Sequence, residues 1–334
     1  MINLFVIYSL ISLILFFLCA KISYRLNFVD LPNKRKIHSK PTAYTGGIII
    51  SIIFLIALEL FDLFNFSNKN INLIIAIGFL ISLVGLVDDR FYLNAGGKLS
   101  LQTIPIFYLV VFENLALHNI GDYNFFKLNL GAFVIPFTII SVLFLINAFN
   151  YFDGIDGNLS FLTISILFIL YFLVPDKNFK LFLIIILLPI TIFLFFNFSI
   201  FNFPKLFLGD SGSLYLGFII SFILIHLSQQ NFVHPILLAW SISIIVYEFL
   251  SINLIRLINN QDPFKAGLDH MHHILYKKTN SILITNFYII ILNISLFIIG
   301  YVSFFKINPL TSLALFAFFF IPFFVLRNKF SKKY

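Results

Sequence analysis

Charged side chains are scarce in this sequence, and their scarcity excludes most soluble proteins. Only 11% of the 334 residues are Asp, Glu, Lys or Arg, whereas 60% are hydrophobic and 47 are Phe. A soluble domain carries about 25% charged residues, with which it covers its surface. Helices that face lipid can instead be apolar around their whole circumference. The composition therefore predicts an all-α protein embedded in a membrane.

Cysteine is almost absent as well. The single cysteine, Cys19, excludes an internal disulfide, and we interpret it as a small apolar side chain in the first membrane span. The net charge of +8 does not indicate nucleic-acid binding, because the basic residues lie in loops between apolar segments.

Eleven apolar runs are long enough, or nearly so, to cross a hydrocarbon core of about 30 Å. We expect a single polytopic domain over residues 1–334, with ten spans if one of two short runs, Leu99–Phe112 or Leu214–Leu227, does not cross. The runs are Leu4–Ala20, Gly46–Leu60, Ile71–Val87, Leu99–Phe112, Leu130–Phe149, Leu159–Val174, Leu181–Phe196, Leu214–Leu227, Phe232–Phe249, Ile282–Val302 and Leu310–Leu326.

Basic residues alternate between the two sides of this arrangement. The loops after odd-numbered runs and the C-terminal tail hold 17 Lys and Arg, and the loops after even-numbered runs hold 5. By the positive-inside rule the N-terminus lies outside and the C-terminus lies in the cytoplasm. The first run is predicted to be a retained anchor, since Lys21 and Arg25 follow it and no basic residue precedes it.

Carboxylates gather in the loops that this rule places in the cytoplasm. Asp88 and Asp89 follow the third run, Asp153 and Asp156 follow the fifth, and Asp210 follows the seventh. The sides were assigned from Lys and Arg alone, so the distribution of the acids is independent support for one shared site.

Two of these acidic segments, at Asp88-Asp89 and at Asp210, have both a functional and a structural interpretation. Adjacent charges at Asp88 and Asp89 repel unless a cation lies near them, although an ordinary helix end paired with Arg90 is an alternative. Lys98 could reach a phosphate. Asp210 stands in a glycine-flanked loop before a helix, where it could cap the helix or bind Mg²⁺, which prefers carboxylate oxygens completed by phosphate and water.

Asn147, Asn150, Asp153 and Asp156 recur every three residues, so that on a helix they form a slanted polar stripe. The glycines that follow the two Asp residues permit irregular backbone and close approach of a ligand inside a water-filled cavity. A polar seam between packed helices is the alternative.

Three imidazoles, from His270, His272 and His273, follow the ninth run. Their spacing does not match that of a zinc-binding helix, so they are better suited to donating hydrogen bonds to phosphate or to moving protons. Solvated loop histidines are the alternative. The basic run from Lys34 to Lys40 is a topology signal or a contact with anionic lipid when taken alone.

Taken in order, these segments resemble the polyprenyl-phosphate N-acetylhexosamine-1-phosphate transferases of glycosyltransferase family 4, and the WecA-like branch more than the MraY-like branch. The segments that carry the resemblance are Pro41–Gly47, Asp88-Asp89, Asn147–Gly157, Phe207–Gly212 and Asp269–His273.

The resemblance implies that the phosphate oxygen of a polyprenyl phosphate attacks the β-phosphorus of a UDP-sugar and releases UMP. The expected donor is UDP-GlcNAc, the lipid is undecaprenyl phosphate, and the cofactor is Mg²⁺, with Mn²⁺ as an alternative. By position, Asp88, Asp89 and Asp210 would be catalytic, and Asp210 and Asp153 would bind the metal. The substrate-binding set would be Lys40, Lys98, Asn147, Asn150, Asp153, Asp156, Phe207, His270, His272 and His273.

The enzyme would then lie in the bacterial cytoplasmic membrane and initiate a lipid-linked cell-envelope polysaccharide; a homodimer is left open. Two alternatives remain. One is the same reaction with another UDP-sugar, such as UDP-MurNAc-pentapeptide or a deoxy-HexNAc. The other is a transporter or flippase of lipid-linked sugars, whose polar residues should lie at the membrane midplane rather than at loop ends.

Overall fold

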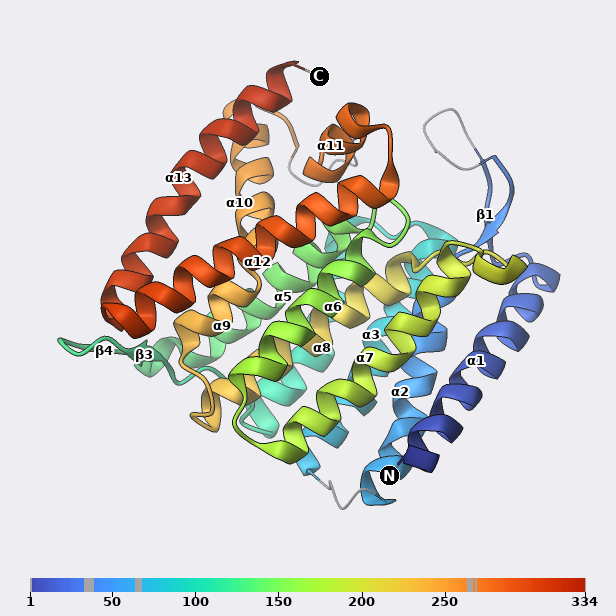
Figure 1. The fold of residues 1–334 in the computed structure, drawn as a ribbon, viewed down its shortest axis with the longest axis horizontal. Coiled ribbons are helices and arrows are strands. Elements are labelled where there is room, and N and C mark those ends of the chain that lie inside the picture. Colours follow the sequence, from blue (N-terminus) through green and yellow to red (C-terminus); the bar gives the residue numbers. More distant parts are fainter. Residues whose placement is uncertain (1, 33–38, 64–67, 263–266, 268, 334) are drawn as a thin grey trace. The chain divides into compact units, whose positions relative to one another are not determined.

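The computed structural model describes residues 2–32, 39–63, 68–262, 267 and 269–333 (Figure 1). Helices dominate the described chain, and its strands form two short antiparallel pairs. The predicted all-α class is therefore confirmed. The α-helices are α1 Ile2–Arg25, α2 Gly46–Leu63, α3 Lys69–Phe91, α4 Ala95–Phe107, α5 Val134–Phe152, α6 Asn158–Leu173, α7 Lys177–Asn197, α8 Gly209–Gln229, α9 Pro235–Ser241, α10 Ser243–Ile258, α11 Met271–Thr279, α12 Ile282–Lys306 and α13 Pro309–Lys333.

The predicted apolar runs all correspond to helices. Within the described residues, eight helices are long and apolar enough to cross a membrane, and the bent pair α9–α10 would make a ninth. The two remaining runs correspond to the shorter apolar helices Gly46–Glu59 and Asn158–Leu173. The chain is a multi-pass membrane protein.

Polar side chains set many of the helix boundaries. Asn68, Asn94, Asp176 and Ser281 each accept a hydrogen bond from a backbone N–H in the first turn of the helix that follows. Such caps satisfy N–H groups that have no partner inside the helix. At the end of α3, Tyr92 adopts a left-handed conformation with φ of 52°, which turns the chain sharply toward α4.

The chain divides into two compact units, each built from two stretches of sequence. Unit 1 comprises Met1–Leu115 and Asp176–Phe222, and unit 2 comprises Ala116–Pro175 and Ile223–Tyr334. The chain therefore leaves unit 1 after α4 and returns to it with α7 and the first part of α8.

In unit 1, α2 packs against α1, α3 and α7. Its polar contacts are short: the hydroxyls of Ser51 and Ser82 join α2 to α3 at 2.9 Å. The backbone of Gly47 lies so close to that of Gly212, at the start of α8, that a Cβ atom at Gly47 would overlap it. Small residues of this kind allow close helix approach in lipid, where packing replaces the hydrophobic effect as the cohesive force. Unit 1 also contains the antiparallel pair β1 Val29–Asp30 and β2 Thr42–Ala43.

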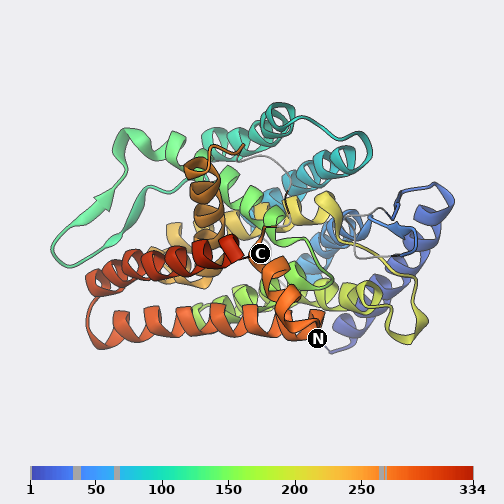
Figure 2. The same cartoon turned by 90° about the horizontal axis from the view of Figure 1, so that it is seen from above.

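In unit 2, α12 is the central helix and packs against α6, α9, α10, α11 and α13. Figure 2 shows α12 and α13 side by side and antiparallel. The indole of Trp240 on α9 is fully buried against Gly300 of α12, where a Cβ atom would overlap the ring. Its Nε1 donates to Ser312 Oγ of α13 at 3.0 Å, so one side chain joins three helices.

The ninth predicted run, Phe232–Phe249, is not one straight helix. The helices α9 and α10 meet at Ile242 with a bend of 71°. The eighth run is longer than predicted, because α8 extends over 21 residues from Gly209. The fourth run passes from α4 into the π-helix η1 Tyr108–Phe112 three residues after Pro105, which lacks the N–H that a regular helix needs.

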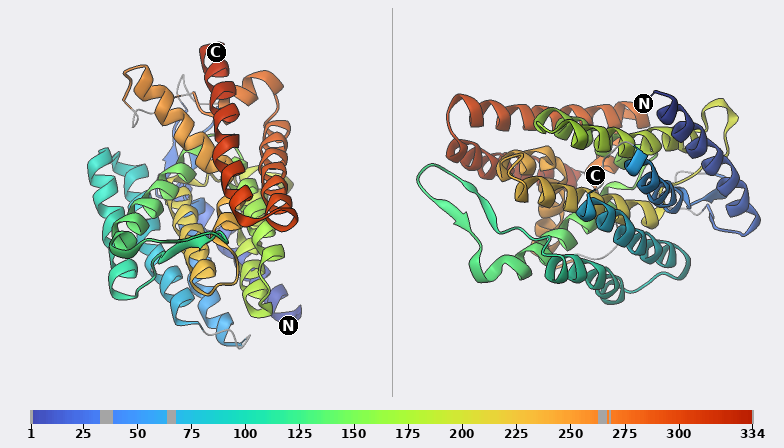
Figure 3. Two further views of the ribbon diagram at one scale, coloured as in Figure 1. Left: turned by 90° about the vertical axis from the view of Figure 1, so that its left-hand side faces the viewer. Right: turned by 90° about the horizontal axis from the view of Figure 1, so that it is seen from below.

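A β-hairpin precedes α5, and Figure 3 shows it as an arm projecting from the helices of unit 2. It consists of β3 Asn119–Asp122 and β4 Lys127–Asn129, and the 3₁₀ turn η2 Gly131–Phe133 connects it to α5. The carboxylate of Asp122 pairs with Lys127 at 3.2 Å. Its backbone oxygen contacts Nε2 of His234 at 3.0 Å, which fastens the hairpin to the start of α9.

Candidate active site

Unit 1 contains a cluster of charged side chains around one lysine, which we call the Lys98 cluster: Asp88, Asp89, Lys98 and Asp210. The Nζ atom of Lys98 lies 2.7 Å from Oδ2 of Asp88 and 2.5 Å from Oδ2 of Asp210. The side chain of Lys98 is 14% exposed and that of Asp88 11%, whereas that of Asp210 is 30% exposed. The structure thus brings two predicted carboxylates, those of Asp88 and Asp210, onto the ammonium group of Lys98, and Asp210 is the most exposed of the three.

The turn between α3 and α4 places Lys98 beside Asp88. Asp88 lies in the last turn of α3, where its backbone oxygen accepts the N–H of Tyr92 and its Oδ1 accepts the N–H of Leu93 at 2.8 Å. Asn94 then begins α4 by accepting the N–H of Gly97. Asp88 therefore lies at a helix end, as the alternative interpretation predicted, but it pairs with Lys98, whereas Arg90 donates to the backbone oxygen of Asn27.

Glycines bring Asp210 to this turn. Gly85 has no side chain, and a Cβ atom there would overlap the backbone of Asp210. Gly209 adopts φ of 72°, which favours glycine, and a Cβ atom at this residue would lie 2.7 Å from Oδ2 of Asp89. The same carboxylate oxygen accepts the N–H of Ser211 at 3.4 Å. Asp210 itself lies in the first turn of α8, where the helix dipole favours negative charge.

Two of the predicted motifs are hydrogen-bonded to one another. The N–H of Phe207 donates to the carbonyl of Ala43 at 2.7 Å, and the N–H groups of Gly46 and Gly47 donate to the carbonyls of Phe207 and Leu208 at 2.9 and 2.8 Å. The Pro41–Gly47 segment thereby holds the loop that carries Asp210.

Two basic residues lie in the segments that these hydrogen bonds join. Lys205 lies over the ring of Phe207, with its Nζ 5.4 Å from the ring centroid. Lys40 is in the exposed chain just before β2, and its carbonyl accepts the hydroxyl of Thr42 at 3.1 Å. The other basic residues of that run, Lys34, Arg35, Lys36 and His38, lie outside the described residues.

The charge of the Lys98 cluster suits a divalent cation. Asp88 and Asp210 share the ammonium group of Lys98, and Asp89 adds a third carboxylate close to the start of α8. Among the described residues, no group of three or more His, Cys, Asp or Glu side chains is arranged to hold a metal ion. Mg²⁺, however, is commonly bound by one or two carboxylates while phosphates and water complete its octahedron. The oxygens at Asp210 fit that requirement; Asp153, the second predicted ligand, belongs to unit 2.

The predicted polar stripe in unit 2 is helical only in its first half. Asn147 and Asn150 lie on α5, and the amide of Asn147 donates to the carbonyl of Leu143 one turn earlier, at 2.7 Å. The helix ends at Phe152, and Asp153 follows with φ of −88° and ψ of 61°. Asp153 and Asp156 therefore lie in the turn between α5 and α6, because the glycines after them release the chain from the helix.

The same turn receives the histidine segment, His270–His273, which begins α11. A Cβ atom at Gly154 would overlap the imidazole of His272, which is 1% exposed. The rings of His270 and His272 stack at 5.6 Å, and the ring of Tyr151 meets His270 edge-on at 4.9 Å. In the described chain, Nδ1 of His270 and Nε2 of His272 have no hydrogen-bond partner. The segment is packed in place, and these two ring nitrogens are buried.

Burial makes these imidazoles neutral. It lowers the pKa of His270 to about 3, with the nearby Arg256 and His273 adding to the effect against Asp269. Burial also lowers the pKa of His272 well below its usual value, and burial and the charge of Lys277 lower the pKa of His273. At neutral pH each ring therefore has one N–H to donate and carries no charge.

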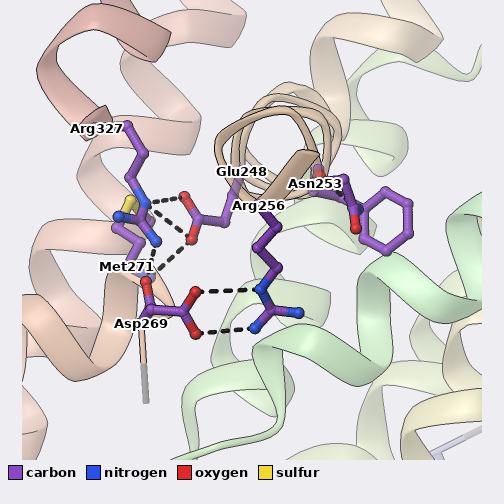
Figure 4. Close-up of polar contacts among 7 residues, drawn as sticks. Glu248, Asn253, Arg256, Asp269, Met271 and Arg327 are labelled. Carbon is purple, nitrogen blue, oxygen red and sulfur yellow. Dashed lines mark hydrogen bonds and ion pairs between the residues drawn. The ribbon is translucent and has the colours of Figure 1, made fainter. Parts of the chain in front are cut away.

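Two arginines brace this segment, and sequence reasoning gave neither of them a role in the site. Arg256 of α10 holds Asp269 through two hydrogen bonds, at 2.8 and 3.2 Å. Burial would raise the pKa of Asp269, but this guanidinium holds it below its usual value. Arg327 of α13 pairs with Glu248 of α10 at 2.8 Å (Figure 4). The missed signal was arginine inside or at the end of an apolar helix, which usually marks a buried partner.

The structure thus defines a polytopic membrane protein with a carboxylate–lysine cluster in one unit and a neutral histidine segment in the other. A model of glycosyl transferase family 4 matches residues 71–228, which include the whole Lys98 cluster and the turn after α5. These findings confirm the resemblance that the sequence motifs predict.

Individual relatives extend the similarity over more of the chain. An undecaprenyl-phosphate alpha-N-acetylglucosaminyl 1-phosphate transferase of Yersinia pestis is 28% identical over 275 residues, covering 80% of this chain and 74% of the relative. The protein of the same name from Escherichia coli (strain K12) is 27% identical, covering 80% of this chain and 76% of the relative. A probable undecaprenyl-phosphate N-acetylglucosaminyl 1-phosphate transferase of Bacillus subtilis is 28% identical, with 80% and 75% covered.

Proposed function

We propose that this protein is a phosphoglycosyltransferase that moves GlcNAc-1-phosphate from UDP-GlcNAc to undecaprenyl phosphate and releases UMP. The observation that carries the proposal is the Lys98 cluster, in which carboxylates of two different helices meet one lysine. The activity named for the relatives supports the sugar and the lipid. Another UDP-sugar remains the alternative donor.

The Lys98 cluster of unit 1 and the histidine segment of unit 2 both belong to the cytoplasmic side of the bacterial inner membrane. The uneven distribution of Lys and Arg supports this orientation, with the N-terminus outside and the C-terminus inside. A cytoplasmic site has direct access to a soluble nucleotide-sugar, while its position at the helix ends keeps it within reach of a lipid phosphate.

Transfer of a phosphoryl group requires positioning and neutralisation of charge more than covalent help. Lys98 binds a phosphate oxygen, and Asp88 orients Lys98. A phosphate monoester is already largely ionised at neutral pH, since its second pKa is about 6, so Asp88 need not act as a base. A lipid phosphate oxygen forms the new bond to the β-phosphorus, and UMP leaves with the electrons of the broken pyrophosphate bond.

The remaining residues bind the donor. Asn147, Asn150, Asp153, Asp156, Phe207 and Lys40 contact the nucleotide and its diphosphate, and the neutral histidines donate hydrogen bonds to phosphate oxygens. Asp210 would hold Mg²⁺ with phosphate and water, and the ion would supply neutralisation of the diphosphate charge; the resemblance also implies Asp153 as a ligand.

The test is transfer by the purified protein in detergent, with labelled UDP-GlcNAc and undecaprenyl phosphate. We expect labelled lipid and UMP in equal amounts, loss of both on chelation with EDTA, and recovery with Mg²⁺. Failure to form labelled lipid with UDP-GlcNAc or any other UDP-sugar would reject the transferase function and favour a flippase.

The matched variants are Asp210→Asn and Asp122→Asn. Asp210→Asn removes the charge of the proposed metal ligand, and we expect turnover to fall by about a hundredfold or more. Asp122→Asn removes the carboxylate of the β3–β4 hairpin, outside the site, and should leave turnover unchanged. Full activity of Asp210→Asn would exclude this residue as a metal ligand.

A further inference from the structure

A buried ion pair joins two helices of unit 2 at a point where the proposed chemistry has no direct use for it. Glu248 of α10 is 1% exposed and Arg327 of α13 is 4% exposed. The Nε atom of Arg327 lies 2.8 Å and 3.1 Å from the two carboxylate oxygens of Glu248. Both residues are on helices that lie in the membrane-spanning part of the chain.

Each member of the pair also reaches the chain that leads into α11. Oε1 of Glu248 accepts the backbone N–H of Met271 at 2.8 Å, and Nη2 of Arg327 donates to the backbone oxygen of Asp269 (Figure 4). Asp269 and Met271 are the two neighbours of His270. The pair therefore fixes the backbone on both sides of the first imidazole of the histidine segment.

The pair is poorly explained as a device for stability alone. Removing two charges from water costs about as much as their attraction returns, so well-packed apolar residues would serve as well. The helices α10 and α13 are in any case joined without it, because the hydroxyl of Tyr247 donates to the carbonyl of Phe316 at 2.6 Å. Apolar residues could not supply an acceptor for the N–H of Met271, the first residue of α11, or a donor to the carbonyl of Asp269.

We infer that Glu248 and Arg327 are positioning residues for the histidine segment: together they hold Asp269 and Met271 so that the imidazoles of His270 and His272 face the donor phosphates. This inference rests on the proposed function for the role of the histidines. Arg256 holds the side chain of Asp269, whereas the pair holds its backbone, so the two contacts constrain different atoms.

The decisive experiment separates stability from positioning with three variants of the full-length protein. Arg327→Met leaves Glu248 buried without its partner and should lower the thermal midpoint. The double variant Glu248→Met with Arg327→Met removes both charges and should restore the midpoint, but not the two backbone contacts. Tyr247→Phe is the matched control, since it removes a hydrogen bond between the same two helices without touching α11.

Two measurements are made on each variant: kcat/KM for transfer from UDP-GlcNAc, and the rate at which diethyl pyrocarbonate modifies each histidine, read by mass spectrometry. For the double variant we expect kcat/KM to fall by about tenfold or more, as small misplacements of substrate-binding groups do. Modification of His270 and His272 should become several-fold faster than in the wild type, while that of the exposed His118 is unchanged. Tyr247→Phe should match the wild type in both measurements.

Wild-type protection of His270 and His272 in the double variant would overturn the positioning role, whatever the turnover. If the double variant does not fold, Arg327→Lys is used, because lysine keeps the charge but cannot bind Glu248 and Asp269 with a planar fork. Unchanged protection in that variant would likewise overturn the inference. A wild-type protein without transferase activity would reject the proposed function, and the modification rates would still decide whether the pair holds the segment.

Discussion

Lys98 shows how the role of a residue depends on a partner that is remote in sequence. Its ammonium lies between Asp88, ten residues away, and Asp210, which is 112 residues away. Without it, the two carboxylates would lie close together and lack the ammonium group that they share. From the sequence, Lys98 could be predicted only to reach a phosphate. The residues next to it in sequence do not indicate that the start of α8 packs against the end of α3.

Substitution of Lys98 should separate charge from geometry. Lys98→Met leaves the carboxylates uncompensated and removes the phosphate contact, so we expect kcat to fall by about a hundredfold. Lys98→Arg retains the charge and should keep more activity than Lys98→Met. Steady-state kinetics in detergent, normalised to correctly folded protein, provides the measurement. Equal activity of the methionine variant and the wild type would exclude a role in turnover.

Gly154 offers a steric test of the histidine segment. A methyl group at this position would overlap the ring of His272, so Gly154→Ala should displace that ring and lower kcat/KM by about tenfold. Gly96→Ala is the control, since a Cβ atom there meets nothing closer than Oδ1 of Asn94 at 3.6 Å. The expected contrast between the two variants is measured in the same transfer assay; a tolerated alanine at Gly154 would mean that the position of His272 does not matter.

At the scale of helices, hydropathy predicted where the spans lie but not how they end or bend. The apolar runs could be found from the sequence because lipid requires length and apolarity, which are local properties. The end of α5 before Asp153 agrees with the local glycines, Gly154 and Gly157, whereas the bend at Ile242 depends on contacts that a local pattern does not contain. The same is true of Glu248: its place in an apolar run was evident, but its partner on α13 lies 79 residues later.

The buried histidines of the segment that begins α11 predict how stability changes with pH. Their pKa values are lowered in the folded protein, so below an unfolded pKa of about 6.5 the unfolded chain binds protons that the folded chain does not. Stability is therefore retained above pH 6.5 and lost as the pH falls below it. Each group contributes up to about 1.4 kcal/mol per pH unit.

We expect the thermal midpoint in detergent to fall between pH 7 and pH 5, and to fall less in His272→Gln, which cannot be protonated in this range. The matched control, His118→Gln, alters an exposed imidazole and should leave the slope unchanged. A slope that His272→Gln does not reduce would mean that His272 is not buried neutral in the folded protein.

At the scale of the whole molecule, the order of the chain distributes the predicted site residues over the two units. Unit 1 supplies the Lys98 cluster, which is complete only when residues 176–222 have returned to it, and unit 2 supplies the turn after α5 and the histidine segment. The sequence predicted these groups as members of one site from their side of the membrane alone. That prediction depends on the assignment of sides, so the topology is the property to measure.

Single cysteines in the full-length chain can measure it, because Cys19→Ser removes the only native thiol. On that background, Asn124→Cys lies at the exposed tip of the β3–β4 hairpin and Lys277→Cys lies on the exposed side of α11. The excess of Lys and Arg in the odd-numbered loops predicts that the hairpin lies outside and α11 in the cytoplasm. A maleimide that cannot cross the membrane should therefore label Asn124→Cys in intact cells, and should label Lys277→Cys only after the inner membrane is permeabilised. Labelling of both cysteines in intact cells would place the hairpin and the histidine segment on the same side, and UDP-sugar in the cytoplasm could then not reach the histidines that are proposed to bind it.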